Sequence, residues 1–444
     1  MGIYSAISTA VSGLRAQSSA LEHISGNIAN SQTIGYKRTE TNFVDLIPDA
    51  APTRQAAGVV LASSRATNEV QGNIESSDTD TYMAVNGDGF FVVSEKVGTA
   101  DSLPVFADTD LYTRRGDFKL DKDGYLVNGA GYYLQGLAVD STTGNVSGSV
   151  PTPIRIDNDF LPAEATTQIT YRANLPASPA SGEMVPGDFA TDPTAGNDEY
   201  VTADDQDTFI EQSIAGGAVT AYDATGSSVN IQFRWALTDD STNTWNLFYL
   251  EDSDATGANA MWRNIGTDFE FGTDGQLTAP AGALSGLSFT VDGMTLSGLT
   301  MTDGDGGLTQ FADVNTASAG VTELSQDGYP AGELVGISVS ETGRIISTYS
   351  NGRQLEMAEV VLAGFNGDDA LRKRDGSAYL ETNESGPPIY GAAGSIVGAA
   401  TESSNTDLAD EFSKLIVTQQ AYTANSRVVT TSDEMLQEVL NIVR

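Results

Sequence analysis

Apolar residues recur at a strict interval of seven near the end of the chain. One series is apolar throughout and consists of Leu408, Leu415, Tyr422, Val429, Leu436 and Val443. A second series is half polar and consists of Phe412, Gln419, Ser426, Asp433 and Leu440. Seven residues make about two turns of an α-helix, so each series forms a stripe along one helix. The pattern predicts a helix over residues 403–444 that packs against a partner on one side and faces a wetter environment on the other.

Residues 1–30 carry a related pattern, in which apolar residues step by four and three. These residues are Ile3, Ile7, Ala10, Leu14, Leu21, Ile24 and Ile28, and Gln17 occupies the missing position. They predict a helix roughly 40 Å long, at ~1.5 Å per residue. Gly13 and Gly26 interrupt it, and each glycine costs about 1 kcal/mol relative to alanine. We expect this helix to pair with the C-terminal one like a coiled coil; two ordinary core helices of a globular domain are the alternative.

The long region between these helices has the features of many short strands. Apolar runs flank the turn sequence Asn86–Gly89, which predicts a hairpin. The stretch 117–127 repeats this pattern around Lys122-Asp123-Gly124, and the runs 230–237 and 244–250 predict a third hairpin. No long helical pattern separates the runs, so parallel β-α-β units are not expected.

The fold class that follows is mainly β with α-helical termini, with an outer β domain inserted in an inner one. Between Pro186 and Gly275 the basic residues are Arg234 and Arg263, among many acidic ones, which is typical of a solvated outer domain. The predicted divisions are a terminal helical assembly domain at 1–30 with 403–444, a linker at 31–75, a discontinuous inner β domain at 76–164 with 326–402, and an outer acidic β domain at 165–325.

The charge of the chain excludes two classes of partner. The sequence has 60 acidic and 22 basic residues, a net charge of −38. Nucleic-acid binders neutralise phosphates with excess Lys and Arg, and anionic membrane surfaces attract the same residues, so neither is an expected partner. No run of 18 apolar residues occurs, so no insertion into a membrane is predicted. The N-terminus lacks the features of a cleavable signal peptide, which favours the cytoplasm or an export route that needs none.

The composition also disfavours most enzymes. The chain has no cysteine and one histidine, His23, which removes disulfides, thiol catalysis and multi-histidine metal sites. Two Asp-Gly clusters begin like calcium loops, but Tyr132 and Val314 stand where a bidentate glutamate is needed. Gly129-Ala130-Gly131 lacks the third glycine of a dinucleotide loop. We therefore predict no catalytic, cofactor-binding or metal-binding residues, no cofactor, and for His23 an ordinary helical contact.

Five segments resemble the flagellar rod and hook family of bacteria. The segment Asn27–Arg38 resembles the N-terminal signature of that family. Four others match it in the same order: Asn86–Phe91, Tyr112–Val127, Gly131–Gly136, and Gln420–Arg427 with Asp433–Leu436. The signature residues are Asn27, Ala29, Asn30, Thr33, Gly35, Tyr36, Lys37, Gly87, Gly89, Phe90, Phe91, Ala424 and Asn425.

Three further segments resemble the hook branch of this family. They are Gly343–Gly352, Val361–Asn366 and the stretch from Leu380 to Pro387. Rod proteins of the family are shorter and lack the large β insert that residues 165–325 supply here.

The resemblance implies a structural subunit and not an enzyme. Family members of the hook branch polymerise into a curved, flexible tube that passes motor torque from rod to filament. Expected partners are further copies of the chain, the rod, the hook cap, the hook–filament junction proteins and the flagellar export apparatus. The resemblance also implies an extracellular location in the flagellum, reached without a cleaved signal peptide.

Assembly through the terminal helices assigns a role to both apolar stripes. The implied assembly residues are Ile3, Ile7, Leu14, Leu21, Ile24, Ile28, Leu408, Phe412, Leu415, Tyr422, Val429, Leu436, Leu440 and Val443. Two alternatives stay open. One is a distal rod or hook–filament junction protein of the same family, and the other is a secreted β-rich adhesin or enzyme.

Overall fold

The computed structural model describes residues 3–46, 59–100, 103–140, 143–157, 160–194, 199–303, 307–391 and 394–442. The chain forms two compact units. The first unit comprises Met1–Asn158, Leu334–Tyr349 and Arg353–Arg444, and the second comprises Asp159–Glu333 and Ser350–Gly352. The chain therefore leaves the first unit, builds the second and returns. The predicted fold class, mainly β with helical ends and one β domain inserted in another, is confirmed.

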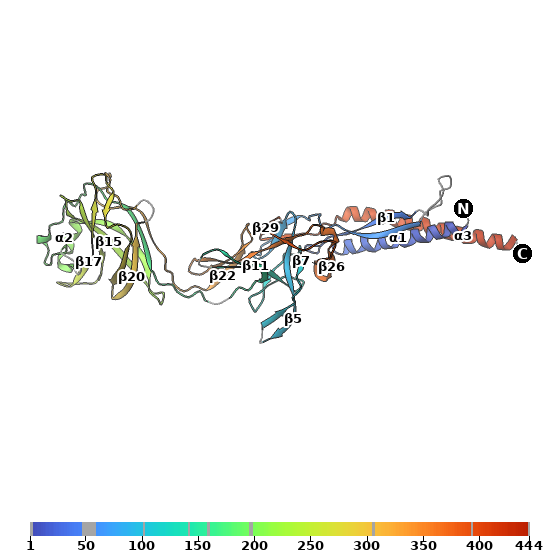
Figure 1. The fold of residues 1–444 in the computed structure, drawn as a ribbon, viewed down its shortest axis with the longest axis horizontal. Coiled ribbons are helices and arrows are strands. Elements are labelled where there is room, and N and C mark those ends of the chain that lie inside the picture. The colour runs from blue at the N-terminus through green and yellow to red at the C-terminus, as the bar shows by residue number, and fades with distance from the viewer. Residues whose placement is uncertain are drawn as a thin grey trace. The chain divides into compact units, whose positions relative to one another are not determined.

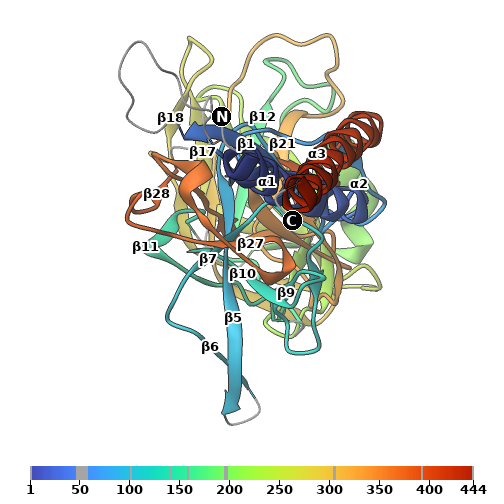
Figure 2. The same cartoon turned by 90° about the vertical axis from the view of Figure 1, so that its right-hand side faces the viewer.

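The two terminal helices, α1 (Ile3–Ala29) and α3 (Leu408–Ile442), lie side by side in the first unit (Figures 1 and 2). α3 begins after Asp407, whose Oδ1 accepts hydrogen bonds from the backbone N–H groups of Ala409 at 2.8 Å and Asp410 at 3.2 Å. Such a side-chain cap satisfies N–H groups that have no partner within the helix. After α1 ends at Ala29, the chain turns over residues 30–35, and Gly35 has a positive φ of 65° there.

A hairpin packs against α1 where a linker was predicted. Strands β1 (Thr39–Leu46) and β2 (Val59–Ala66) pair antiparallel within residues 31–75. The β2 strand is held to α1 by a hydrogen bond from the Val60 N–H to Ser12 Oγ, at 3.3 Å. The prediction missed the hairpin because β1 opens with four polar residues and shows no alternation. Its partner strand and the helix beneath it supply the pairing and burial that the local pattern does not reveal.

The main sheet of the first unit combines strands from both sides of the insertion. Its principal order is β22 (Leu334–Val339), β23 (Arg344–Tyr349), β24 (Gln354–Val360), β10 (Tyr132–Val139), β5 (Phe90–Ala100), β7 (Leu111–Thr113), β27 (Ala378–Leu380) and β26 (Arg372–Arg374). Strands β6 (Leu103–Phe106), β8 (Lys119–Leu120), β9 (Leu126–Val127), β11 (Val146–Pro153), β25 (Leu362–Gly364) and β28 (Ile389–Tyr390) attach to it. Two small sheets pair β4 (Met83–Asn86) with β29 (Ser395–Gly398) and β3 (Ile74–Ser76) with β30 (Ala400–Glu402).

Strand β5 is buried on both faces of this sheet. Phe91 and Val93 belong to one apolar cluster, while Phe90 and Val92 belong to another on the opposite face. Alternate side chains of a strand point to opposite faces, so this one strand links two cores. Beyond Ser94 the strand becomes exposed and, with β6, forms a hairpin that projects from the sheet (Figure 2).

The hairpin predicted around Asn86–Gly89 was wrong, whereas the other two are confirmed. Strand β4 pairs with β29 and not with β5, and Gly87 and Gly89 adopt φ values of 95° and 109° in the turn between β4 and β5. Gly394 allows this pairing, because a side-chain carbon there would lie 2.1 Å from the Asn86 carbonyl oxygen. The β8–β9 hairpin forms around the second turn, and the third joins β15 (Ser228–Asp239) to β16 (Thr244–Leu250).

The second unit consists of two sheets that share one core. One sheet has the order β13 (Tyr200–Thr202), β17 (Ala260–Phe271), β16, β15 and β14 (Ile214–Tyr222), with β18 (Leu277–Ala279) beside β17. The other has the order β19 (Leu284–Val291), β20 (Met294–Thr302), β12 (Gln168–Asn174) and β21 (Gly320–Gln326). The helix α2 (Gln206–Glu211) and the short 3₁₀ helices Pro186–Asp188 and Ala203–Asp205 complete this unit, and 3₁₀ helices Asp368–Ala370 and Asp375–Ser377 belong to the first. The predicted outer domain, residues 165–325, lies within the second unit.

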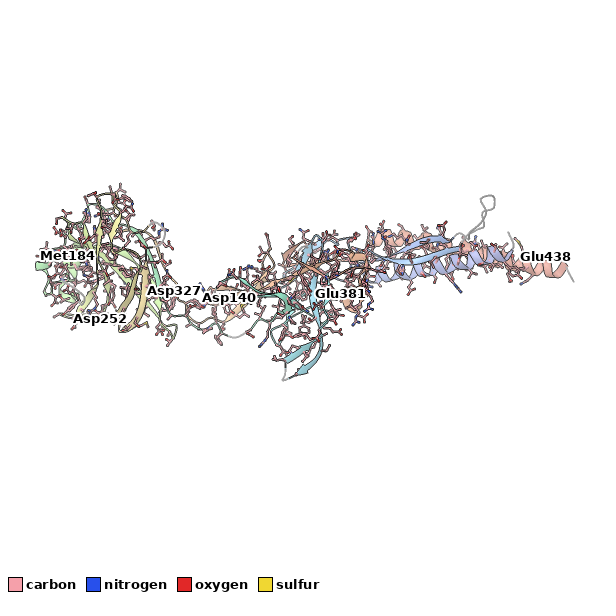
Figure 3. The ribbon with its side chains drawn as sticks, in the orientation of Figure 1. Asp140, Met184, Asp252, Asp327, Glu381 and Glu438 are labelled. Carbon is pink, nitrogen blue, oxygen red and sulfur yellow. The ribbon has the colours of Figure 1, made fainter. Side chains whose placement is uncertain are left out.

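Aromatic side chains fill the core of the second unit. Trp235 and Trp245 are fully buried, and Trp235 donates from Nε1 to the Tyr171 hydroxyl at 2.8 Å. The Tyr171 hydroxyl in turn donates to the Gly216 carbonyl at 2.5 Å. At one edge, Asp327 (Figure 3) accepts hydrogen bonds from Thr167 and Gln168. Burial by itself would raise the pKa of the Asp327 carboxyl. These hydrogen bonds together lower it by more, so the pKa lies below its usual value.

Candidate assembly site at the terminal helices

The two terminal helices meet through small and polar side chains. The buried positions of α1 include Ala10, Gly13, Ala16, Ala20 and Ile24, and those of α3 are Glu411, Thr418 and Ser432 among the described side chains. A side-chain carbon at Gly13 would lie 2.9 Å from Asn425 Nδ2, so the helices approach too closely there for a larger residue. The helices therefore approach closely, and none of the large apolar side chains described on α3 is fully buried between them.

Many large apolar side chains of α3 are exposed in the single chain. Leu408, Phe412, Ile416, Val417, Tyr422, Val428 and Met435 have exposed fractions of 41%, 50%, 55%, 65%, 42%, 44% and 53%. Single exposed apolar residues are common, but a series along one helix is typical of an interaction surface. Because an α-helix turns about 100° per residue, these seven residues lie on both flanks of the stripe that faces α1, and together we call them the outer face of α3.

The predicted assembly residues divide between the pair and this outer face. Ile24 is buried, while Ile7, Leu14, Leu21 and Ile28 of α1 are half-buried. Leu415, Val429 and Leu436 of α3 are also half-buried, whereas Leu408, Phe412 and Tyr422 belong to the outer face. Val443 and the side chains of Ile3 and Leu440 lie outside the described residues.

Asn27 connects the two helices at their sheet-proximal end. Its Nδ2 donates to Glu411 Oε2 on α3 and to the Thr39 carbonyl, both at 3.0 Å. Its Oδ1 accepts from the Thr39 N–H at 2.9 Å and from the Tyr36 hydroxyl at 3.3 Å. All hydrogen-bonding positions of this buried amide are thus occupied. Burial, and secondarily the charge of Glu411, raises the pKa of Tyr36.

A cluster of three buried charges lies next to this contact. Lys37, Arg114 and Glu402 have side chains at most 1% exposed. Lys37 Nζ lies 2.5 Å from Glu402 Oε1, and Arg114 Nη1 lies 3.3 Å from Glu402 Oε2. Burial lowers the pKa of Lys37, although its pairing with Glu402 opposes that shift. We call these three residues the ionic cluster.

Backbone groups from three further places bind the ionic cluster, in which Arg114 Nε is buried without a hydrogen-bond partner among the described residues. Lys37 Nζ donates to the Val70 carbonyl at 2.7 Å, and the Gly72 N–H donates to Glu402 Oε1 at 2.8 Å. Arg114 Nη2 donates to the Gly87 carbonyl at 2.8 Å, and its guanidinium carbon lies 5.2 Å from the Phe90 ring centroid. Hydrogen bonds of this kind are what allow charges to be buried.

Glycine is required where the chain segments meet around the ionic cluster. A side-chain carbon at Gly35 would lie 2.6 Å from the Arg115 backbone nitrogen, and one at Gly72 would lie 2.0 Å from the Ser403 carbonyl oxygen. Asn405 adds a further connection: its Oδ1 accepts from the Arg38 N–H at 2.8 Å, and its Nδ2 donates to the Val70 carbonyl at 3.1 Å. The segments that leave α1 and enter α3 are therefore fixed to each other.

The structure brings the first two family signatures together at this place. Asn27, Gly35, Tyr36 and Lys37 come from one, and Gly87 and Phe90 come from the other, with Arg114 between them. Asn30 and Thr33 form a local turn through their side chains, at 3.1 Å. Phe91 packs in the sheet core, Gly89 forms the turn after β4, and Asn425 lies against Gly13. Ala29 and Ala424 are exposed.

Sequence reasoning missed Arg114, Glu402, Asn405 and Glu411 as functional residues. A weak signal existed for Glu402, since it is the one charged residue between Ser395 and Ser404. An isolated charge among small and apolar residues is a candidate for burial with a partner. His23, predicted as an ordinary contact, bridges the hairpin: its Nδ1 lies 2.7 Å from Thr41 Oγ1 and its Nε2 lies 3.0 Å from Ser64 Oγ.

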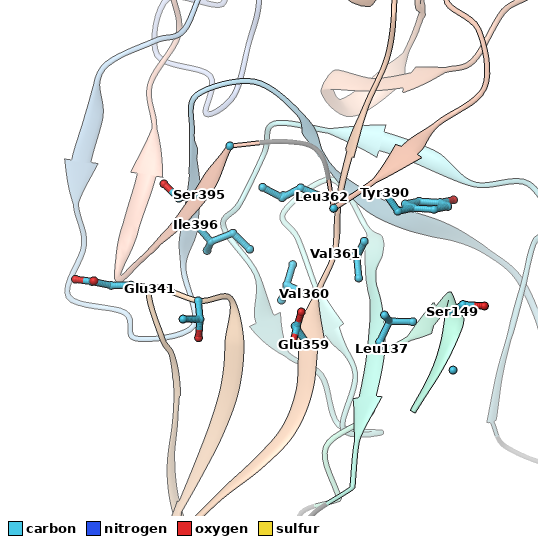
Figure 4. A pocket seen from close by; sticks show the side chains of 14 residues that line it. Leu137, Ser149, Glu341, Glu359, Val360, Val361, Leu362, Tyr390, Ser395 and Ile396 are labelled. Atoms are coloured by element: carbon cyan, nitrogen blue, oxygen red, sulfur yellow. The ribbon is translucent and has the colours of Figure 1, made fainter. Parts of the chain in front are cut away.

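A shallow cavity in the first unit offers no catalytic arrangement. It has a volume of about 410 Å³ and is lined by apolar side chains, among them Val360, Leu362 and Ile396 (Figure 4). Its charged lining residues are Glu341 and Glu359, and Glu359 lies 3.4 Å from Arg344 Nε. Within the described residues, no three metal-ligating side chains gather. None of the helices described is both long enough and apolar enough to span a bilayer.

Four protein-family descriptions match the chain in order along its length. Residues 7–37 match "Flagella basal body rod protein", and residues 84–170 match "Flagellar hook protein FlgE/F/G D1 domain". Residues 186–329 match "Flagellar basal body protein FlaE D2 domain", and residues 397–442 match "Flagellar basal body rod FlgEFG protein C-terminal". The first and last matches contain the two helices whose contact is described above.

Curated relatives align with the chain from end to end. The flagellar hook protein FlgE of Brucella abortus is 28% identical over 449 residues, covering 100% of both chains. FlgE of Salmonella typhimurium is 28% identical over 441 residues, covering 98% of this chain and 99% of that protein. A crystal structure of the Helicobacter pylori flagellar hook protein FlgE2 covers 72% of this chain and 98% of its own, at 16% identity and a TM-score of 0.49. The chain belongs to the flagellar rod and hook protein family.

Proposed function

We propose that this chain is a structural subunit of the bacterial flagellar hook, which polymerises into a curved, flexible tube and passes torque from the rod to the filament. The observation that carries this proposal is the end-to-end alignment with hook proteins, including the large domain at residues 186–329. The terminal matches are named for rod proteins, so the ends by themselves would not separate rod from hook. The relatives are structural proteins, and the chain is not an enzyme.

The outer face of α3 supplies the contact between subunits in this proposal. A polymer subunit needs apolar surface that the single chain leaves uncovered, because burial of such surface stabilises association by roughly 25 cal/mol per Å². The same surface must recur on every copy and meet a different surface on the next, since such contacts generate helical polymers. The exposed series from Leu408 to Met435 meets the first requirement.

The acidity of the chain opposes this association. Each copy carries a net charge of −38, so neighbouring copies repel one another at low ionic strength. The Debye length falls from about 10 Å at 0.1 M salt to about 3 Å at 1 M salt, which screens that repulsion. Assembly in solution should therefore improve as salt is added.

The location and the neighbours of the subunit follow from the same proposal. The flagellum and its basal body are where proteins of this family assemble. We place this subunit in the extracellular hook, exported by the flagellar apparatus without a cleaved signal peptide. There it would contact further copies of itself, the rod, the hook cap and the hook–filament junction proteins.

Electron microscopy of the purified chain tests the proposal directly. The full chain is concentrated in high salt and compared, under negative stain, with a chain that lacks residues 1–30 and 403–444. Curved tubes from the full chain, and single particles from the shortened chain, are the expected result. Straight rods would favour the rod branch of the family, and polymers from the shortened chain would contradict assembly through the terminal helices.

A further inference from the structure

We propose that the ionic cluster of Lys37, Arg114 and Glu402 is a positioning device that sets the register of α3 against α1. The proposal rests on the function above, because the register decides where the outer face of α3 is presented to the next subunit. The three residues touch no neighbouring copy in this proposal. They act through the helices that they anchor.

The place of the ionic cluster in the chain supports this role. Lys37 lies in the segment that leaves α1, and Glu402 lies in the segment that enters α3. Arg114 connects both to the sheet, because it contacts Glu402 and also donates to the Gly87 carbonyl. The segments that flank the two helices are thus fixed to one another and to the sheet at one place.

The contact between the helices gives little selection of register along its length. Its buried positions are small or polar, such as Ala20 and Gly13 on α1 and Thr418 and Ser432 on α3. Register in paired helices is normally specified by large knobs in matching holes or by a buried polar pair. Ile24 is the large apolar side chain buried in the described part of the pair, while Leu415 is half-buried and most large side chains of α3 are exposed. The polar contacts at the sheet-proximal end therefore carry much of this selection.

The energetics of buried charges agree with a positioning role. Removing charges from water costs free energy that their attraction and hydrogen bonds must offset, so a buried ionic group adds little net stability. Its best-attested use is to favour one geometry over its competitors. The ionic cluster is strongly determined in this sense, because its charged atoms bind residues 70, 72 and 87 as well as one another.

A change of register has a definite consequence. One helical turn moves a residue of α3 by about 5.4 Å along α1. The side chain next to Gly13 would then be Ala421 or Val429 in place of Asn425. The outer face would be displaced by the same distance toward a neighbouring subunit, and the repeat of the polymer would lose uniformity.

Disulfide trapping measures the register, because the chain has no cysteine of its own. One variant combines Gly13→Cys with Asn425→Cys and reports the register described here. Two others combine Gly13→Cys and Asn425→Ala with either Ala421→Cys or Val429→Cys, and they report shifts of one turn. The alanine in these two variants removes the Asn425 side chain, which the first variant replaces with cysteine, so position 13 has similar room in each. With the ionic cluster intact, the 13–425 pair should be trapped at least about tenfold faster than either other pair.

The ionic cluster is then neutralised as a unit by Lys37→Met, Arg114→Met and Glu402→Gln. Glutamine retains an acceptor for the Gly72 N–H, and replacing all three avoids an unpaired buried charge. The preference for the 13–425 pair should fall to about threefold or less. A preference that stays at tenfold would overturn the proposal, and so would its absence while the ionic cluster is intact.

A matched variant separates positioning from general stability. Ile345→Ala removes a fully buried side chain from the same sheet without touching the ionic cluster. It should lower the stability of the first unit and keep the 13–425 preference; a preference lost in this variant too would assign the ionic cluster a merely structural role. The three tryptophans lie in the second unit and report that it stays folded in every variant. A chain that keeps the 13–425 preference but forms no polymer would contradict the proposed function and would leave the register proposal intact.

Discussion

The core of the second unit and the contact between the terminal helices are built from opposite kinds of side chain. The core contains Trp235, Trp245 and Phe289, and the rings of Trp235 and Phe289 meet other aromatic rings edge to face. The helix contact contains Ala20, Gly13 and Thr418. The second unit buries this aromatic core within itself. The helix pair leaves several of its own in solvent, which is a property of a surface that another copy covers.

The two regions therefore differ in what they need to be stable. A core that closes on itself does not require a partner, whereas a helix with exposed apolar side chains gains much of its stability from packing. Variants in the second unit should change its own unfolding and leave assembly intact. Variants on the outer face of α3 should weaken assembly and leave the unfolding of both units unchanged. Variants at the ionic cluster should change the unfolding of the first unit.

The largest effect is expected from Trp235→Ala in the second unit. The side chain is fully buried, and its loss should lower the free energy of unfolding of this unit by about 3–5 kcal/mol. Denaturation followed by the fluorescence of Trp245 and Trp262 measures the change. The comparison between the regions fails if the far-ultraviolet transition of the first unit moves by a similar amount.

Glu402→Gln should lower the stability of the first unit by about 3 kcal/mol, because Lys37 and Arg114 lose their buried counter-charge. Circular dichroism in denaturant measures this loss, and tryptophan fluorescence should be unchanged. Glu75→Gln is the matched control, since Glu75 is exposed on β3, the strand that pairs with β30. Equal losses in both variants would mean that the burial of Glu402 is energetically irrelevant.

Ile416→Asp should weaken each contact between subunits by about 2 kcal/mol, because it places a charge on the outer face of α3. The mass of sedimented polymer after assembly in high salt measures the effect, and the unfolding of both units should be unchanged. Val314→Asp adds the same charge at a fully exposed position in the second unit and should assemble normally. Normal assembly of the Ile416 variant would remove the outer face from the proposed interface.

Alkaline pH should destabilise the second unit through Tyr171. Burial, offset in part by the hydrogen bond from Trp235, raises the pKa of this hydroxyl above its usual value near 10. The stability it contributes is complete below pH 10 and is lost as the pH rises, because the unfolded chain releases the proton first. The loss from Tyr171 should be about 1.4 kcal/mol at pH 11. Tyr171→Phe should abolish this part of the pH dependence, and an unchanged profile would show that other groups cause it.

Several features of the fold were predictable because they depend on short-range sequence patterns. The seven-residue spacing from Leu408 to Leu436 predicted a long C-terminal helix, and the helix forms there. The turn at Lys122–Gly124 predicted the β8–β9 hairpin, and the two strands pair. The family signatures predicted a rod or hook protein before any contact was known. Each of these signals lies within a short stretch of chain.

Other features depend on segments that are far apart in the sequence. The β4 strand pairs with β29 across more than three hundred residues, so the turn that follows β4 could not reveal its partner. The β1–β2 hairpin was read as a linker, because its stability comes from α1 and not from its own alternation. Glu402 gave only a weak signal, since its partners Lys37 and Arg114 lie 365 and 288 residues away in the sequence.

By itself, the sequence determined the helices at both ends, the β-rich region between them and the family, because periodicity and short motifs are local properties. Only the tertiary structure decided that Phe412 and Tyr422 are exposed in the single chain while Leu415, in the same stripe as Tyr422, is half-buried. A repeat of seven shows which residues share a stripe, but the neighbour that covers each stripe is set by the whole chain. The same reason applies to the ionic cluster, whose charges become a unit only when the two ends of the chain meet.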